Sequence, residues 1–300
     1  MAFGLKKMWA AAAAALALTG CASGPRTENA SSTPLPAMWK VSDADTTIYL
    51  FGTIHLLPEG QSWRGPAFEQ ALASADELVL EVANADDATA GAGAMMKLGI
   101  SPNLPPLRMR VAEAKRPALD AMIKDAGIPA AALDRMETWA ASVVLLGVSF
   151  QRMGLDPSLG VEKAITGTWK ARGKPVRGLE TIEEQFGFFD TLPEAQQRTF
   201  LEGVLDSPEE AKKQFAAMLN AWSKGDLNAL AAAFADEENL TPELREVLLT
   251  RRNAKWAEWL DGRMDKPGTT FVAVGAGHLA GKDSVQALLA KRGFKATRVQ

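Results

Sequence analysis

The stretch Thr47-Ile48-Tyr49-Leu50-Phe51-Gly52-Thr53-Ile54-His55 joins an apolar run to a glycine and a histidine. Its β-branched and aromatic residues favour a strand, and Gly52 allows a tight turn at the end of that strand. The same order returns near the other end of the chain, where Phe271-Val272-Ala273-Val274 precedes Gly275-Ala276-Gly277-His278. The chain has only these two histidines. Because histidine ligates transition metals and titrates near neutral pH, the two strand ends predict one shared site.

Four predicted strands end in a residue that is suited to chemistry, and these residues are His55, Glu81, Glu180 and His278. In open α/β sheets, ligands lie outside the carboxyl ends of the strands. If the four strands are parallel, the four side chains converge there. Two imidazoles and a carboxylate form a common ligand set for a divalent metal and leave a position for water. The second carboxylate could then serve as a base.

Each of these residues also has a plain structural interpretation. A histidine after a strand is most often a hydrogen-bonded structural residue, and Glu81 at a strand end is equally typical of a surface glutamate. Glu180 precedes a predicted helix over residues 181–190, so it favours the role of a helix cap. Arg252 and Asn253 lie in the middle of a predicted helix, where a solvated face is the ordinary expectation.

The chain alternates strands with helical segments and predicts one α/β domain over residues 38–300. Its central mixed sheet has flanking helices and a helical insertion at about 90–172. We expect the Gly/Ala stretch at 90–94 to be weakly structured. A helix predicted at 281–291 would begin just after His278, so its positive N-terminus would add to the field at that histidine.

The N-terminal residues have the pattern of a lipoprotein signal. Residues 1–20 carry two lysines and a short alanine-rich apolar segment, and Leu18-Thr19-Gly20-Cys21 resembles a bacterial lipobox. Cleavage would leave Cys21, the only cysteine, for acylation by palmitate and related lipids. Residues 21–37 predict a flexible tether. Because Ala22 follows the cysteine, we expect an outer-membrane lipoprotein that faces the periplasm.

Composition excludes several other classes of protein. The net charge is −3, and no basic stripe with interleaved aromatic residues is present, so we expect no nucleic-acid partner. No segment after Gly20 is long and apolar enough to predict a transmembrane helix. Acylation of Cys21 would leave no free cysteine for disulfides or metal binding.

Several motifs follow one another along residues 38 to 298. They are Tyr49-Leu50-Phe51-Gly52-Thr53-Ile54-His55, Leu78-Val79-Leu80-Glu81, Gly154-Leu155-Asp156-Pro157 with Gly160-Val161-Glu162, Lys174 to Gln185, Arg252-Asn253 and Val272 to Leu279. In this order they resemble the TraB/GumN family. Glu162 is a departure, because relatives often carry Asp there, and its role is left open.

The resemblance implies a fold shared with TIKI peptidases, erythromycin esterases and ChaN-type haem-binding lipoproteins. TIKI peptidases depend on Mn or Co and use paired GxxH histidines and a glutamate, which correspond to His55, His278 and Glu81 here. Erythromycin esterases use equivalent groups to activate water. ChaN-type relatives bind haem.

Our first hypothesis is a metal-dependent hydrolase, with a peptidase as the leading candidate, that acts on a peptide or small-molecule substrate. His55, His278 and Glu81 would ligate Mn, Co or Zn, with Glu81 as ligand or base, while Glu180 and Arg252 would orient the substrate or the ligands. The second hypothesis is a metal-free esterase-like hydrolase in which His55, paired with Glu81, activates water. The third is a binding protein for haem or another ligand, and the fourth is a catalytically idle envelope protein. The sequence leaves substrate, metal identity and oligomeric state open.

Overall fold

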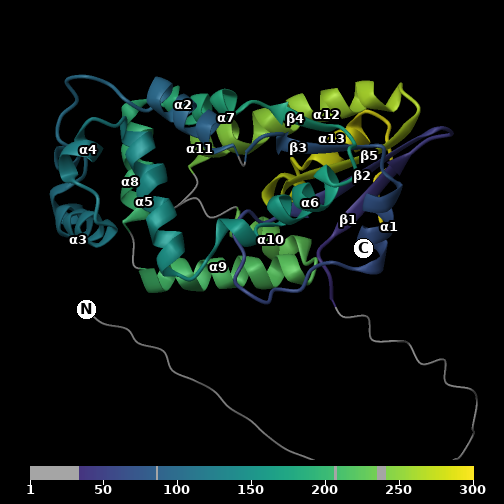
Figure 1. The fold of residues 1–300 in the computed structure, drawn as a ribbon, viewed down its shortest axis with the longest axis horizontal. Coiled ribbons are helices and arrows are strands. Elements are labelled where there is room, and N and C mark those ends of the chain that lie inside the picture. Colours follow the sequence, from purple (N-terminus) through teal and green to yellow (C-terminus); the bar gives the residue numbers. More distant parts are fainter. Residues whose placement is uncertain (1–33, 86, 206–207, 235–240) are drawn as a thin grey trace, which may run out of the picture. The chain divides into compact units, whose positions relative to one another are not determined.

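The central sheet has the strand order β4-β3-β5-β2-β1-β6 (Figure 1). The computed structural model describes residues 34–300, apart from residues 86, 206–207 and 235–240. The strands are β1 (Met38–Ser42), β2 (Thr46–Thr53), β3 (Glu77–Val82), β4 (Val176–Glu180), β5 (Gly268–Gly275) and β6 (Thr297–Arg298). β1 pairs antiparallel with β2 and with β6, so the sheet is mixed as predicted.

The four strands that carry the predicted site are parallel. β5 pairs in parallel with β2 on one side and with β3 on the other, and β3 pairs in parallel with β4. The register places Thr53 opposite Gly275 and Val82 opposite Glu180. Their carboxyl ends therefore meet at one edge of the sheet, as the sequence predicts.

Helices fill the long connections between these parallel strands. α2 to α6 lie between β3 and β4, and α7 to α12 lie between β4 and β5. The helices are α1 (Pro66–Ser74), α2 (Ala88–Leu98), α3 (Arg116–Ala126), α4 (Ala130–Asp134), α5 (Thr138–Arg152), α6 (Val161–Lys170), α7 (Ile182–Asp190), α8 (Glu194–Val204), α9 (Pro208–Ser223), α10 (Leu227–Ala233), α11 (Pro242–Arg245), α12 (Arg251–Met264) and α13 (Val285–Lys291). Short 3₁₀ turns span Leu107–Met109, Glu113–Lys115, Pro157–Leu159 and Ala276–Leu279, and a π-helix spans Glu246–Thr250.

Two local predictions are wrong. The Gly/Ala stretch at 90–94 is part of α2, because the Asp87 side chain caps the helix by accepting from Thr89 N and Ala90 N, and because alanine favours helix. The last long helix, α13, begins only at Val285, after a 3₁₀ turn. Its N-terminus therefore does not follow directly on His278.

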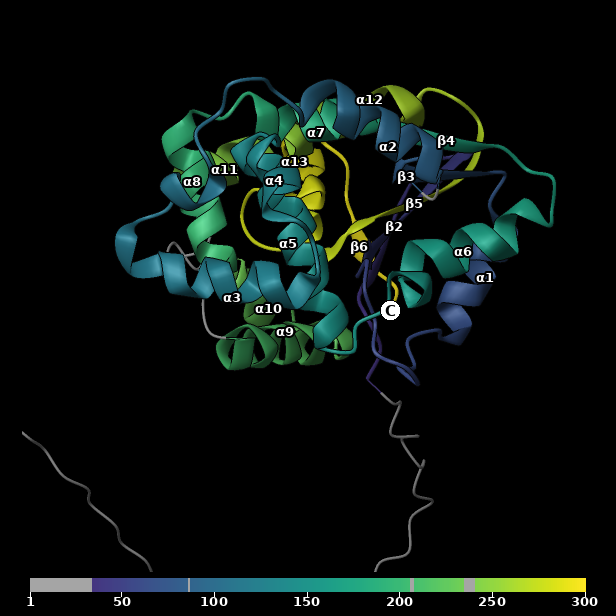
Figure 2. The same ribbon diagram turned by 60° about the vertical axis from the view of Figure 1, so that its left-hand side comes forward.

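Alternating side chains of the strands build a core on each face of the sheet. Phe51 packs with Phe68 of α1, Ile165 and Trp169 of α6 and Trp222 of α9 in one cluster. The other cluster holds Ile48, Leu50 and Val272 with Trp256 and Leu260 of α12 and Val285 of α13. Figure 2 shows the strands between α13 on one side and α1 and α6 on the other. A third cluster, away from the sheet, joins α3, α4, α5 and α8 through Leu119, Leu133, Leu145 and Leu201.

The lipobox prediction at Cys21 lies outside the described residues. Within the part of the chain that the structure describes, no helix is long and apolar enough to cross a membrane.

The two glycine–histidine turns approach each other closely at Gly52. A Cβ built on Gly52 would lie 3.1 Å from Ala276 Cα, which is backbone and cannot rotate away. We therefore expect Gly52→Ala to lower the free energy of unfolding by about 1–3 kcal/mol, as overpacking does. Gly147→Ala, at an exposed position of α5, is the matched control, because nothing lies within 4 Å of its Cβ position. The control should be neutral or stabilising in urea unfolding; equal effects of the two changes would contradict the close approach.

Candidate functional site

The side chains that follow the four parallel strands gather at one edge of the sheet. His55 comes two residues after β2, Glu81 lies in β3, Glu180 ends β4, and His278 lies in the 3₁₀ turn after β5. Glu81, Glu180 and His278 are buried, with exposed fractions of 9% or less. His55 differs, because 66% of its side chain is exposed.

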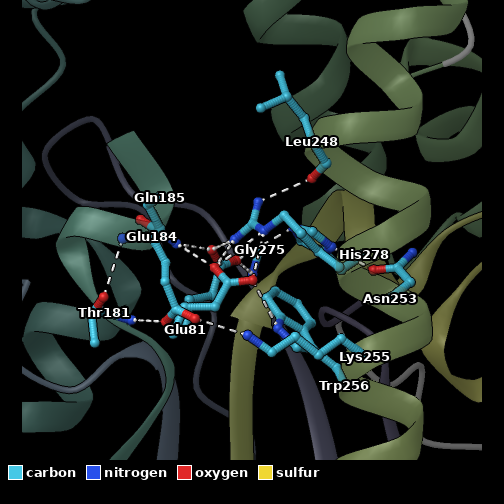
Figure 3. Close-up of polar contacts among 12 residues, drawn as sticks. Glu81, Thr181, Glu184, Gln185, Leu248, Asn253, Lys255, Trp256, Gly275 and His278 are labelled. Carbon is cyan, nitrogen blue, oxygen red and sulfur yellow. Dashed lines mark hydrogen bonds and ion pairs between the residues drawn. The ribbon is translucent and has the colours of Figure 1, made fainter. Parts of the chain in front are cut away.

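Glu81 accepts hydrogen bonds from three different residues of the site (Figure 3). Its Oε2 accepts from Arg252 Nη2 at 2.6 Å and from Gln185 Nε2 at 2.9 Å, and its Oε1 accepts from the Gly275 backbone N–H at 2.7 Å. Burial would raise its pKa, but His278, Arg252 and His55 and the Gly275 amide together lower the pKa of Glu81 to about 2. Glu81 is therefore a fixed negative charge at neutral pH.

Arg252 of α12 joins Glu81 to Glu180. Its Nε and Nη2 bond both oxygens of Glu180 at 2.9–3.2 Å, and the Glu180 carboxylate also accepts from Trp256 Nε1 at 3.0 Å. The guanidinium lies over the rings of Trp256 and Phe188, with 4.9 and 5.3 Å to the centroids. Burial would lower the pKa of Arg252, but the two carboxylates outweigh burial and raise it. The cation is thus held permanently beside Glu81.

A π-helix precedes Arg252 in the chain. It spans Glu246–Thr250, and the Leu248 carbonyl in it accepts from Arg252 Nη1 at 3.0 Å. The wider turn of a π-helix is frequent at functional sites. Here it leads directly into the helix that supplies the buried cation.

The side-chain amide of Asn253 holds the His278 ring, and its own orientation is fixed by a second hydrogen bond. Asn253 Nδ2 donates to the Asp283 carbonyl at 2.8 Å, so its Oδ1 faces His278 Nδ1 at 2.5 Å. The imidazole hydrogen therefore lies on Nδ1, and the lone pair of Nε2 faces Glu81 Oε1 at 3.7 Å. Burial lowers the pKa of His278 to about 3 against the attraction of Glu81, so the ring is neutral at pH 7.

His55 is held in a corresponding way by a carboxylate. Its Nδ1 lies 2.7 Å from Glu162 Oε1 at the start of α6, and Glu162 also accepts from the Thr53 hydroxyl. The charge of Glu162 raises the pKa of His55 to about 9, despite partial desolvation. Both histidines thus use Nδ1 for an oxygen acceptor and leave Nε2 for the site.

Gly275 lies among all three of these groups. A Cβ built on it would lie 3.0 Å from Glu81 Oε1, 3.6 Å from His278 Cδ2 and 3.8 Å from His55 Nε2. A side chain at this position would occupy the space that the two rings and the carboxylate share. The glycine of the second motif therefore keeps that space open.

A pocket of about 480 Å³ opens beside His55. It is lined by the β3 end, by the start of α6 and by Gln185 of α7. The lining residues are His55, Leu80, Glu81, Val82, Ala83, Ala85, Ser158, Gly160, Glu162, Lys163, Thr166 and Gln185. The site thus has an open side at His55 and a closed side at His278.

Two structural interpretations from the sequence are wrong. Glu180 does not cap the following helix, because Thr181 is the cap and forms a capping box with Glu184. The Glu180 carboxylate is instead buried, where it neutralises the charge of Arg252. Arg252 and Asn253 do not lie on a solvated face, since they are 9% and 2% exposed. Tertiary contacts, which helical spacing does not reveal, bury them against the sheet.

Sequence reasoning brought together His55, Glu81, His278, Arg252 and Glu180, and it missed three partners. Glu162 orients His55 and accepts a hydrogen bond from Thr53, and Gln185 bridges Glu81 and Glu180. In the sequence these residues stand out only as members of motifs, without an assigned role. Glu162 offered one signal, since it is acidic and lies in a motif shared with relatives. Its pairing with His55 depends on α6 lying beside β2, which the sequence does not show.

The parallel sheet, the paired glycine–histidine turns and the buried Glu–Arg cluster define an α/β protein with a polar site at its strand ends. The sequence profile of the TraB/PrgY/gumN family matches residues 37–298, and the chain belongs to this family.

Similar curated proteins are themselves described as uncharacterized. YbaP of Escherichia coli (strain K12) is 26% identical over 243 residues, which cover 80% of this chain and 87% of YbaP. YbaP of Shigella flexneri matches to the same extent. A protein of Treponema pallidum (strain Nichols) is 22% identical over 275 residues, or 85% of this chain and 80% of its own length. No solved structure matches the chain significantly.

The buried cluster makes the stability of the protein depend on Arg252. Arg252→Met would leave Glu81 and Glu180 buried without their cation, so we expect a loss of about 3–5 kcal/mol in the free energy of unfolding. Arg251→Met is the matched control, because Arg251 is 70% exposed in its pair with Glu246. The control should change stability by less than about 0.5 kcal/mol in urea unfolding at pH 7. Similar losses in both variants would contradict the charge cluster.

The two histidines should make the free energy of unfolding depend on pH in two separate pH ranges. The pKa of His278 falls from 6.5 to about 3 on folding, so the unfolded chain binds the extra proton below pH 6.5 and stability falls as pH falls. In chelator-treated protein we expect a slope of up to about 1.4 kcal/mol per pH unit between pH 6.5 and 4.5.

His278→Gln should remove that slope, while His55→Gln should retain it. The pKa of His55 is raised to about 9, so its contribution is full below pH 6.5 and is lost as pH rises through 9. Urea unfolding at several pH values measures both ranges. An unchanged slope in His278→Gln would show that the ring is not held neutral.

Proposed function

We propose that this protein is a hydrolase whose reaction takes place at His55, Glu81 and His278, with a divalent metal ion as its cofactor. One observation carries the proposal. Each histidine has its Nδ1 held by an oxygen acceptor, and the Nε2 atoms are left for the space around Gly275 and Glu81. This is the arrangement by which proteins orient metal-ligating histidines.

The donor set fits a divalent ion in its chemistry. Two imidazole nitrogens and a carboxylate suit Zn, Co or Mn. His278 Nε2 and Glu81 Oε1 are 3.7 Å apart, and one ion about 2.0–2.2 Å from each ligand spans that separation. Among the described residues no three His, Cys, Asp or Glu side chains form a ready-made metal group, so His55 Nε2 would have to approach the other two.

The ion, when bound, would supply Lewis-acid activation of water and of a carbonyl group. Glu81 would contribute its negative charge, and its pKa of about 2 makes it a poor base near neutral pH. Arg252 and Gln185 would keep Oε2 of Glu81 occupied and so direct Oε1 to the site. His55 would have to release its proton in order to ligate, so ion affinity should fall as pH falls below about 9.

The site is open beside His55, and we propose that the substrate enters there. The pocket borders His55 and Glu81 but does not reach buried His278. A scissile carbonyl held in this pocket would lie next to the two groups that face it. A peptide bond or a small-molecule ester or amide fits this chemistry, and a peptidase remains our first proposal.

A second candidate function is metal-free hydrolysis, and the His55–Glu162 pair favours it. Glu162 orients the ring and stabilises its protonated form, while Nε2 lies 3.8 Å from the Cβ position of Gly275, on the side of Glu81. His55 would then hold or transfer a proton at Nε2, as general acid–base catalysts do. The sequence predicted Glu81 as the partner of His55; the partner in contact with Nδ1 is Glu162.

Elemental analysis of the purified protein, beside two histidine variants, tests the metal proposal. We expect one Mn, Co or Zn per chain after reconstitution, and loss of at least tenfold in affinity in His55→Ala and His278→Ala, because each removes a ligand. Glu59→Ala, at an exposed position outside the pocket, is the control. Circular dichroism checks that each variant is folded.

Turnover of peptide and ester libraries, with and without chelator, separates the candidates. Chelator-sensitive turnover supports the metal-dependent hydrolase. Chelator-resistant turnover that His55→Ala and Glu162→Gln both weaken supports the metal-free candidate. Folded protein with neither metal nor turnover would overturn both.

Haem binding and lipid anchoring remain predictions. Of the two histidines, His55 alone borders the pocket, so an absorption band on haem addition that disappears in His55→Ala would support a haem site. The lipid anchor rests on Cys21, and labelling of wild type against Cys21→Ser with a palmitate analogue tests it. The outer-membrane location facing the periplasm rests on Ala22, and fractionation of the two membranes tests it.

A further inference from the structure

The pocket beside His55 has two walls of different chemistry. The wall at the end of β3 consists of apolar residues, namely Leu80, Val82, Ala83 and Ala85. The wall at the start of α6 consists mainly of polar residues, namely Ser158, Glu162, Lys163 and Thr166, with Gly160. Glu81 belongs to β3, His55 contacts Glu162 of α6, and both groups lie within 4 Å of the Cβ position of Gly275.

The apolar wall continues toward the surface. Leu80 and Val82 are 3% exposed, Ala83 is half-buried and Ala85 is exposed. A polar group bound along this wall would lose its hydration without gaining a hydrogen-bond partner from those side chains.

We infer that the substrate of the proposed hydrolase is an ester or amide of an apolar carboxylic acid with a polar alcohol or amine. The acyl chain lies along Val82, Ala83 and Ala85, and the polar leaving group lies along Ser158 and Thr166. The carbonyl that joins them is then beside His55 and Glu81. This inference rests on the proposed function for its reaction, and on the two walls for its substrate.

The volume of the pocket limits how long an acyl chain it can hold. A volume of about 480 Å³ lies within the 300–1,000 Å³ typical of small-molecule sites. It holds a compact acyl group together with the polar part of the substrate. Affinity should therefore rise with chain length at first and then level off when the apolar wall is covered.

A binding experiment tests the substrate class independently of turnover. The probes are N-(2-hydroxyethyl) amides of acetic, butyric, hexanoic and octanoic acid, and the readout is the shift of ¹³C-labelled alanine methyl signals in the full chain. We expect the Ala83 and Ala85 signals to move and affinity to rise about fourfold per methylene, from ~0.8 kcal/mol per buried CH₂, up to a limit.

Two types of variant assign the walls. Ala83→Leu and Ala85→Leu would fill the apolar side, so each should abolish the gain for the longer amides. Ala132→Leu, on exposed α4 outside the pocket, is the matched control and should retain the gain. Thr166→Val should weaken all four amides by the same factor, because it changes only the polar wall.

The outcomes distinguish this inference from the proposed function. Chain-length-dependent binding without hydrolysis of the matching esters would retain the acyl pocket and overturn the hydrolase. Hydrolysis with affinity independent of chain length, or with the same gain in Ala83→Leu and Ala85→Leu as in wild type, would retain the hydrolase and overturn the acyl pocket.

Discussion

The ion pair between Glu81 and Arg252 is the interaction on which the rest of the site depends. A buried carboxylate is costly unless it is paired and hydrogen-bonded, and Glu81 is bonded to Arg252, Gln185 and the Gly275 amide. Glu180 balances the cation from the next strand. These bonds tie β3, β4, β5, α7 and α12 together at one point. The charge that would attract a metal ion in the proposed function is therefore also a structural element, and removing its partner would leave it unpaired.

The paired GxxH motifs have different physical tasks although they share a pattern. The first glycine, Gly52, lets its turn pack against Ala276 of the second turn, whereas Gly275 keeps open the space between Glu81 and the two rings. The first histidine is exposed and bound to a carboxylate, and the second is buried and bound to an amide. One histidine thus borders the pocket, and the other is buried behind Glu81.

The site is asymmetric, because its pocket borders only His55 of the two histidines. A substrate would enter between the apolar end of β3 and the polar start of α6, and it would meet His55 before Glu81. Glu162 lies on the same α6 wall, so the group that orients His55 also lines the pocket. Binding and proton transfer at His55 would therefore be coupled through Glu162, which is why we expect Glu162→Gln to change both.

The sequence by itself determined the strands, their glycine ends and the residues His55, Glu81 and His278, because these signals are local and apolar runs followed by glycine are strong. Parallel pairing then fixes their convergence. Only the tertiary structure decided that Arg252 and Glu180 are buried partners and that Glu162 holds His55. Helical spacing predicts which residues share a face, but it does not show which element covers that face. The start of α13 was mispredicted for a related reason, since the 3₁₀ turn at His278 is set by its packing between the first turn and α12.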